Sequence, residues 1–97
     1  MNISGYTFEG SWALGQEFNN VPGIYVIFTD QVWLDVGETD QLGNRINGEN
    51  HDRKPDWIRH SQQRQINIAF LREASSDARL RIEAHLRSVL NPVCGER

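Results

Sequence analysis

Two short apolar runs separated by three polar residues constrain this chain most. Residues 24–28 are β-branched or aromatic, and residues 32–36 return to the same composition after Thr-Asp-Gln. Runs of this length and composition are typical of strands, and a three-residue connection has the length of a hairpin loop. Val-Pro-Gly at 21–23 is a turn signal ahead of the first run. The pattern therefore predicts an antiparallel hairpin.

Helical patterns and one more strand follow the hairpin. Thr39 or Asp40 supplies an N-cap oxygen for the first helix, and Ser75 or Ser76 caps the last, which Pro92 limits. The predicted elements are a helix over 41–46, a helix from 55, a strand over 66–71 and a helix to residue 90. The order strand-strand-helix-helix-strand-helix predicts an α/β (α+β) fold, with a small mixed or antiparallel three-stranded sheet flanked by helices.

Length and composition indicate one domain. The chain has 97 residues, with a core expected over 21–92 and an N-terminal arm or extra strand over 1–20. No apolar run approaches the about 20 residues of a membrane helix, and the N-terminus lacks the features of a signal peptide. Cys94 is the only cysteine, which excludes an intrachain disulfide and favours a cytoplasmic location.

Charge is distributed unevenly along the chain. Residues 1–44 hold six acidic residues and no Lys or Arg, whereas residues 45–97 hold ten basic and seven acidic residues. The basic stretch, residues 45–64, carries four arginines and one lysine against three acids. Because a phosphate backbone responds to local potential, this stretch is compatible with nucleic-acid binding despite a net charge of −3. An ordinary solvated surface is the alternative.

Several residues follow one another in an order found in a known family. Gly23-Ile24-Tyr25 opens the first run, and Asp35-Val36-Gly37 begins ten residues after Tyr25. Arg45 follows eight residues after Gly37, and Glu83 lies on the last predicted helix. This order resembles the GIY-YIG nuclease domain, and the match extends from Pro22 to about Pro92. Aspartate at position 35 replaces the tyrosine of the family's second tripeptide.

The resemblance implies catalytic roles for three residues. Tyr25 corresponds to the proposed general base, or to the group that orients the attacking water. Arg45 would stabilise negative charge in the transition state, since a guanidinium donates two parallel hydrogen bonds to phosphate. His51 lies near a position where some members carry a histidine. An ordinary strand tyrosine, a solvated arginine and an uninvolved loop histidine are the alternatives.

Asp35 leaves three roles open. It is a candidate metal ligand, a candidate base, or a structural ion-pair partner of Arg45. A strand-end aspartate facing solvent is a further alternative.

Glu83 is the candidate metal ligand. It lies at the edge of an apolar stripe with helical spacing, formed by Ala78, Ile82, Leu86 and Val89. The resemblance implies that this carboxylate binds one Mg²⁺ or Mn²⁺, completed by waters and phosphate oxygens. In many members an asparagine follows the proline by three positions, where this chain has Gly95. A solvated helix glutamate is the alternative.

Nucleic-acid contacts are expected from two groups of residues. One is the turn from the second strand into the first helix, with Gly37 and Thr39, because Gly37 permits close backbone approach and the free amides of the helix's first turn favour an anion such as phosphate. The other comprises Arg53, Lys54 and Arg59 of the basic stretch. The three tryptophans are expected to be buried in the core of so small a domain. The alternative is stacking on bases, for which Trp57 is the best exposed candidate.

Together these features predict a metal-dependent endonuclease acting on nucleic acid, with DNA as the expected substrate. A protein partner is a possible source of specificity, because no second DNA-binding domain is seen in the sequence. The alternative is a non-catalytic nucleic-acid or protein binding module on the same scaffold.

Overall fold

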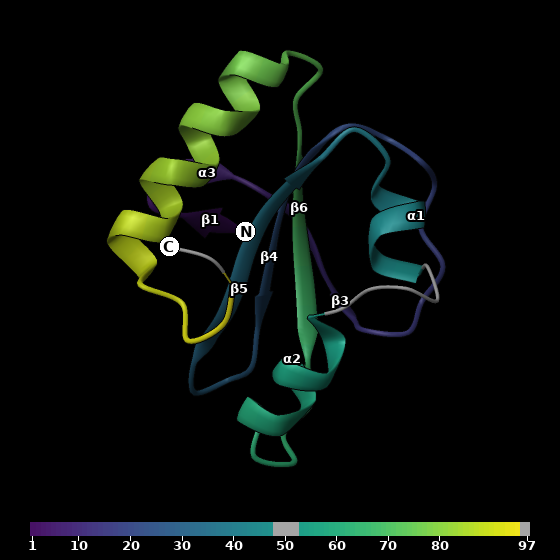
Figure 1. The fold of residues 1–97 in the computed structure, drawn as a ribbon, viewed down its shortest axis with the longest axis vertical. Helices are drawn as coiled ribbons and strands as arrows, with labels where there is room; N and C mark the ends of the chain where they lie inside the picture. The colour runs from purple at the N-terminus through teal and green to yellow at the C-terminus, as the bar shows by residue number, and fades with distance from the viewer. Residues whose placement is uncertain (48–52, 96–97) are drawn as a thin grey trace.

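A four-stranded antiparallel sheet forms the centre of the fold, with three helices packed on it (Figure 1). The computed structural model describes residues 1–47 and 53–95. In chain order the elements are β1 (Asn2–Ile3), β2 (Tyr6–Thr7), β3 (Glu9–Ala13), β4 (Gly23–Phe28), β5 (Trp33–Thr39), α1 (Leu42–Asn47), α2 (Lys54–His60), β6 (Asn67–Arg72) and α3 (Ser76–Leu90). The predicted mixture of helices and antiparallel strands is confirmed, but the prediction of three strands in the sheet was wrong.

The strand order in the sheet is β3-β6-β4-β5, so β4 and β6 are the inner strands. Tyr25 of β4 lies opposite Phe70 of β6 on one side and opposite Gly37 of β5 on the other. The fourth strand is β3, which pairs with the outer edge of β6. Within residues 1–20, the extra strand is therefore present, while β1 and β2 form a separate two-stranded sheet.

The two faces of β4 are covered by different elements. Because side chains alternate along a strand, Ile24 and Val26 face one side and Tyr25 and Ile27 the other. Ile24 and Val26 belong to a core with Leu86 of α3, whereas Tyr25 and Ile27 pack with residues of α1 and α2. Figure 1 shows α3 on the left of the sheet and α1 on its right. All five residues from Gly23 to Ile27 are buried.

The helices begin and end close to their predicted positions. Ser75 caps α3, because its hydroxyl accepts a hydrogen bond from the amide of Ala78 at 3.2 Å. Leu86 is fully buried, but Val89 is 51% exposed, and Leu90 packs on the core instead. The predicted apolar stripe was therefore wrong at its last position. No helix in the described part of the chain is long and apolar enough to cross a membrane.

The C-terminal segment covers part of the free edge of β5. The amide of Val93 donates to the carbonyl of Trp33 at 3.1 Å, and the amide of Cys94 donates to the carbonyl of Leu34 at 2.8 Å. These bonds satisfy backbone groups that an edge strand otherwise leaves unpaired. They also bring residues 93–95 beside Asp35.

Candidate active site

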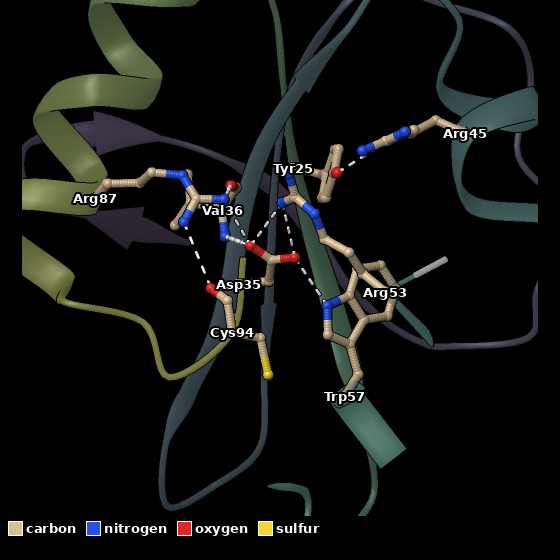
Figure 2. Close-up of polar contacts among 8 residues, drawn as sticks. All are labelled: Tyr25, Asp35, Val36, Arg45, Arg53, Trp57, Arg87 and Cys94. Atoms are coloured by element: carbon tan, nitrogen blue, oxygen red, sulfur yellow. Dashed lines mark hydrogen bonds and ion pairs between the residues drawn. The ribbon is translucent and has the colours of Figure 1, made fainter. Parts of the chain in front are cut away.

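Tyr25 and Arg45, which the motif spacing singles out, are in direct contact. The Arg45 Nε donates a hydrogen bond to the Tyr25 hydroxyl at 3.2 Å (Figure 2). Leu42 and Ile46 bury the inner face of α1, which leaves Arg45 half-buried at its edge. The ion pairs among the described residues involve other arginines. The terminal nitrogens of Arg45 are therefore available to an anion such as a phosphate.

Gly37 leaves the space that the Tyr25 ring occupies. The two residues lie opposite each other on neighbouring strands, and any Cβ at position 37 would collide with the ring and hydroxyl of Tyr25. The glycine thus allows the tyrosine to lie flat against β5. This packing role accounts for Gly37 without the expected phosphate contact.

Burial determines the protonation state of Tyr25. The side chain is 0% exposed, and burial raises the pKa of its hydroxyl above the ordinary value of 10.0, although the hydrogen bond from Arg45 acts in the opposite direction. Tyr25 is therefore neutral at physiological pH. A neutral phenol can orient a neighbouring group through its hydrogen bonds, but it is a poor base.

Asp35 is a buried ion-pair partner of two arginines. Its carboxylate is 0% exposed and accepts hydrogen bonds from Arg53 Nη1 at 3.1 Å and from Arg87 Nη2 at 2.7 Å. Trp57 Nε1 donates to the second carboxylate oxygen at 2.8 Å, and the amide of Val36 donates at 2.8 Å. We call Asp35, Arg53, Trp57 and Arg87 the Asp35 cluster (Figure 2).

This geometry selects among the roles that the sequence left open for Asp35. The structural ion pair is present, but its partners are Arg53 and Arg87, and the expected pairing with Arg45 was wrong. A carboxylate whose two oxygens already accept all these hydrogen bonds is a poor candidate for a base, because its lone pairs are occupied. The site therefore has no obvious acceptor at the position of the family's second tyrosine.

Gly95 packs directly against the Asp35 cluster. A Cβ at this position would collide with an Asp35 oxygen and with the guanidinium nitrogens of Arg53 and Arg87. Its φ of +90° is also a conformation that favours glycine. Arg87 further bonds to the carbonyl oxygens of Val36 and Cys94. Asp35 and Gly95, the two positions that differ from the GIY-YIG pattern, therefore lie against each other.

Glu83 lies between two arginines of its own helix, each four residues away. Arg79 Nε donates to Glu38 at 3.0 Å, and Arg87 bonds to Asp35. Glu83 is half-buried, and burial raises the pKa of its carboxyl above 4.5. The charge of Arg87 opposes this shift, while Glu38 raises the pKa through its charge and lowers it through a backbone hydrogen bond. Glu83 therefore belongs to the charge network around β5, to which Arg53 also contributes.

The surroundings of Glu83 are compatible with a hard divalent cation. Two neighbouring carboxylates, Glu83 and Glu38, repel each other, and carboxylate oxygens are the ligands that Mg²⁺ prefers. No group of three or more His, Cys, Asp and Glu side chains that could hold a metal occurs among residues 1–47 and 53–95. A cation here would therefore depend on Glu83, with Glu38 as a neighbour, and on waters and phosphate oxygens.

Trp57 and Thr39, two further candidates for contact with nucleic acid, have structural roles in the fold. The expected burial of Trp57 is confirmed and the alternative of base stacking is wrong: the side chain is 0% exposed and donates to Asp35. Thr39 is nearly buried at the end of β5, where its hydroxyl accepts from the amide of Gln41 at 3.0 Å and so begins the turn into α1. His51 lies outside the described residues.

Most arginines of the basic stretch have acidic partners within the protein. Arg53 pairs with Asp35 at 3.1 Å, and Arg64 pairs with Asp30 at 2.9 Å. Arg59 pairs with Asp56 at 2.8 Å, but both groups are exposed, and such pairs contribute only about 0–1 kcal/mol. Among the described residues, fewer cations are therefore left for a phosphate-binding surface than the sequence suggests, and the candidates are Arg45, Lys54 and Arg59.

Comparisons with family models, with curated proteins and with solved structures gave no match for this chain. The functional interpretation therefore depends on the geometry of these residues.

Sequence reasoning did not identify Arg87 or Trp57 as neighbours of this site. No sequence signal pointed to Arg87, apart from its position four residues after Glu83. The only signal for Trp57 was its place within the basic stretch.

Proposed function

We propose that this protein is a metal-dependent endonuclease that hydrolyses phosphodiester bonds of nucleic acid, with DNA as the expected substrate. The observation that carries the proposal is the hydrogen bond between Arg45 and Tyr25. Tyr25 and Arg45 are 20 positions apart in the sequence and both belong to the nuclease motif, and their side chains meet at 3.2 Å. Gly37, another residue of that motif, lies opposite Tyr25 on the neighbouring strand. The single cysteine and the absence of an apolar run are compatible with the expected cytoplasmic location.

In this proposal Arg45 is the group that meets the substrate. Its terminal nitrogens would donate hydrogen bonds to non-bridging phosphate oxygens and stabilise charge that develops there. Tyr25 lies beneath it as a neutral phenol, and holds the guanidinium through Nε. The raised pKa of Tyr25 favours the orienting role over that of a base.

Glu83 would hold the single Mg²⁺ or Mn²⁺, with Glu38 nearby. When bound, the cation would supply positive charge to the phosphate oxygens as a Lewis acid. Glu83 must be ionised to bind it, and its half-buried position between Arg79 and Arg87 keeps the carboxylate on the side of α3 that faces β5. Among the described residues, Arg53, Arg79 and Arg87 around β5 balance the charges of Asp35, Glu38 and Glu83, whereas Arg45 forms no ion pair.

Replacing Arg45 with alanine should lower metal-dependent cleavage by about 100-fold, because one charged donor to the transition state is lost. Cleavage should be measured on single-stranded, duplex and branched DNA and on RNA, with Mg²⁺, with Mn²⁺ and with a chelator. Arg81→Ala is the matched control, since Arg81 is an exposed arginine on α3, and it should stay within about twofold of wild type. Equal effects of the two substitutions would contradict the role of Arg45.

Binding to nucleic acid should weaken with salt, and Lys54→Ala should reduce the slope of log K against log salt by about one. Lys54 has no ion-pair partner among residues outside 48–52 and 96–97. Asp35 already neutralises Arg53, so Arg53→Ala should change the slope less and should lower stability instead. Fluorescence anisotropy between 50 and 300 mM salt, roughly the range where counterion release is steep, measures both. A slope unchanged in Lys54→Ala and Arg59→Ala together would exclude this phosphate-binding surface.

A non-catalytic binding module is the second candidate. Two observations favour it. Where the family has a tyrosine, the Asp35 cluster places a carboxylate whose oxygens already accept hydrogen bonds within the protein, and Tyr25 is fully buried. The cleavage assay separates the two functions. Salt-dependent binding without metal-dependent cleavage on any of the four substrates would support the binding module.

A further inference from the structure

A cavity of about 240 Å³ opens between β3, β6 and the loop that precedes β4. It lies on the α1 side of the sheet, and Phe70, the cross-strand neighbour of Tyr25, forms part of its lining. This volume is slightly below the about 300 Å³ at which pockets for drug-sized ligands begin. The cavity therefore suits a small chemical group.

Hydrogen bonds to α1 fix the loop that forms one wall of this cavity. Asn47 holds it twice, accepting from the amide of Phe18 at 2.9 Å and donating to the carbonyl of Gln16 at 2.7 Å. The amides of Leu42 and Gly43 donate to the carbonyls of Val21 and Asn19 at 3.0 and 3.2 Å. The cavity is thus preformed, and a ligand would bind without the cost of ordering a loop.

Aromatic rings meet at an angle in this cavity. The rings of Trp12 and Phe18 are 5.8 Å apart between centroids, with an interplanar angle of 67°. Both rings line the cavity together with Phe70. Rings at such an angle form a corner, and the negative face of each ring attracts a cation placed against it.

The charged residues of the lining leave an excess of negative charge. Arg72 Nε pairs with Glu9 at 2.7 Å, so these two charges compensate each other. Glu17 also lines the cavity, and no cation pairs with it among residues 1–47 and 53–95. Residues 1–44, which supply most of the lining, contain no Lys or Arg. A cation therefore fits both the rings and the charge, whereas an anion would be repelled.

We propose that this cavity, the aromatic-acidic pocket, binds an alkylammonium group, with Trp12 and Phe18 as its aromatic walls and Glu17 as its counter-ion. The group can belong to a small molecule or to a lysine side chain of a peptide, because the pocket recognises only the cation and its alkyl substituents. This site is separate from the Tyr25–Arg45 pair, and its occupancy does not require nuclease activity.

Choline and its uncharged analogue 3,3-dimethyl-1-butanol test the proposal, since the two have the same shape. Titration of the ¹⁵N-labelled protein should shift the Trp12 indole resonance saturably with choline, with a Kd in the millimolar range. The neutral analogue should bind at least about tenfold more weakly. A peptide with trimethyllysine, compared with choline, identifies the source: tighter binding of the peptide indicates a peptide partner, and equal binding indicates a small molecule.

Two variants and one control complete the experiment. Glu17→Gln and Trp12→Leu should each weaken choline binding by about tenfold, because one removes the counter-ion and the other a ring face. Asp77→Asn removes an exposed carboxylate of α3, outside the pocket, and should leave binding within about twofold. Glu17 is exposed, so its variant will fold even where Trp12→Leu does not. Absence of a saturable shift, equal binding of the neutral analogue, or equal loss in Glu17→Gln and Asp77→Asn would each overturn the proposal.

Discussion

Replacing Asp35 with alanine is expected to lower the free energy of unfolding by about 3–5 kcal/mol, the usual cost of removing one partner from a buried ion pair. The carboxylate is fully buried and accepts hydrogen bonds from Arg53, Trp57 and Arg87. Its removal leaves two guanidinium groups beside each other without a shared anion. Urea denaturation followed by circular dichroism measures the change, provided that the m-value is unchanged.

The chain supplies a matched control for this measurement. Asp30 also pairs with an arginine, Arg64 at 2.9 Å, but both side chains are exposed. Asp30→Ala should therefore cost less than about 1 kcal/mol. Equal costs for the two substitutions would show that the Asp35 cluster contributes no more than a surface ion pair.

Asp35→Asn separates the structural role from catalysis. Asparagine keeps the size of the side chain but loses its charge, so stability should fall while the position stays filled. If Asp35 were a base, cleavage would disappear with little change in stability. The comparison of unfolding and cleavage in one variant thus decides between the two roles.

The hairpin and the helices were predictable because they depend on local sequence. Apolar runs at 24–28 and 32–36 predicted β4 and β5, and Ser75 predicted the beginning of α3. The fourth strand, β3, has the sequence Glu-Gly-Ser-Trp-Ala, which lacks the alternation of a half-buried strand. Its pairing with β6 joins residues far apart in the sequence, and no local pattern determines that contact.

The candidate site was predictable in part. The spacing of the two tripeptides and Arg45 identified the Tyr25–Arg45 pair, because Tyr25 lies in the predicted hairpin and Arg45 in the helix that directly follows it. The partners of Asp35 come from positions 18 and 52 residues downstream, and only the three-dimensional structure brings them together. The surroundings of Trp57 depend on the same kind of long-range contact, since its ring packs against Tyr25 and its indole nitrogen donates to Asp35.

The contact between Asp35 and Gly95 changes how the departures from the family pattern are understood. Taken separately, each substitution weakens the resemblance. Taken together, they form one packed unit, because a side chain at position 95 would displace Asp35, Arg53 and Arg87. The unit is also in contact with the Tyr25–Arg45 pair, because the rings of Tyr25 and Trp57 are 6.3 Å apart between centroids, and the charges of Asp35 and Arg53 both act on the pKa of Tyr25.

Glu83→Gln is expected to lower metal-dependent cleavage by at least about 1,000-fold, if Glu83 is the ligand of the divalent cation. Glutamine keeps the shape and the helix propensity but loses the negative charge that a hard cation requires. The several kcal/mol that a bound metal contributes to transition-state stabilisation correspond to this factor. The assay uses the same four substrates with Mg²⁺, with Mn²⁺ and with a chelator.

Stability gives a second measurement that does not depend on activity. Burial raises the pKa of Glu83 in the folded protein above its unfolded value, so the folded state favours the protonated form. The ionised carboxylate therefore costs stability at pH 7, and this cost vanishes as the pH falls below the ordinary value of 4.5. Glu83→Gln should raise the Tm slightly at pH 7 and leave it unchanged near pH 3.5, roughly below both pKa values.

Metal linkage and a control distinguish the remaining explanations. Mg²⁺ should raise the Tm of the wild type by mass action, but not that of Glu83→Gln. Asp77→Asn removes an exposed carboxylate from the first turn of the same helix, and it should keep both cleavage and the Mg²⁺ effect. A lower Tm for Glu83→Gln at pH 7, with the same Mg²⁺ response as wild type, would instead make Glu83 a structural partner of Arg87, and the nuclease proposal would lose its metal site.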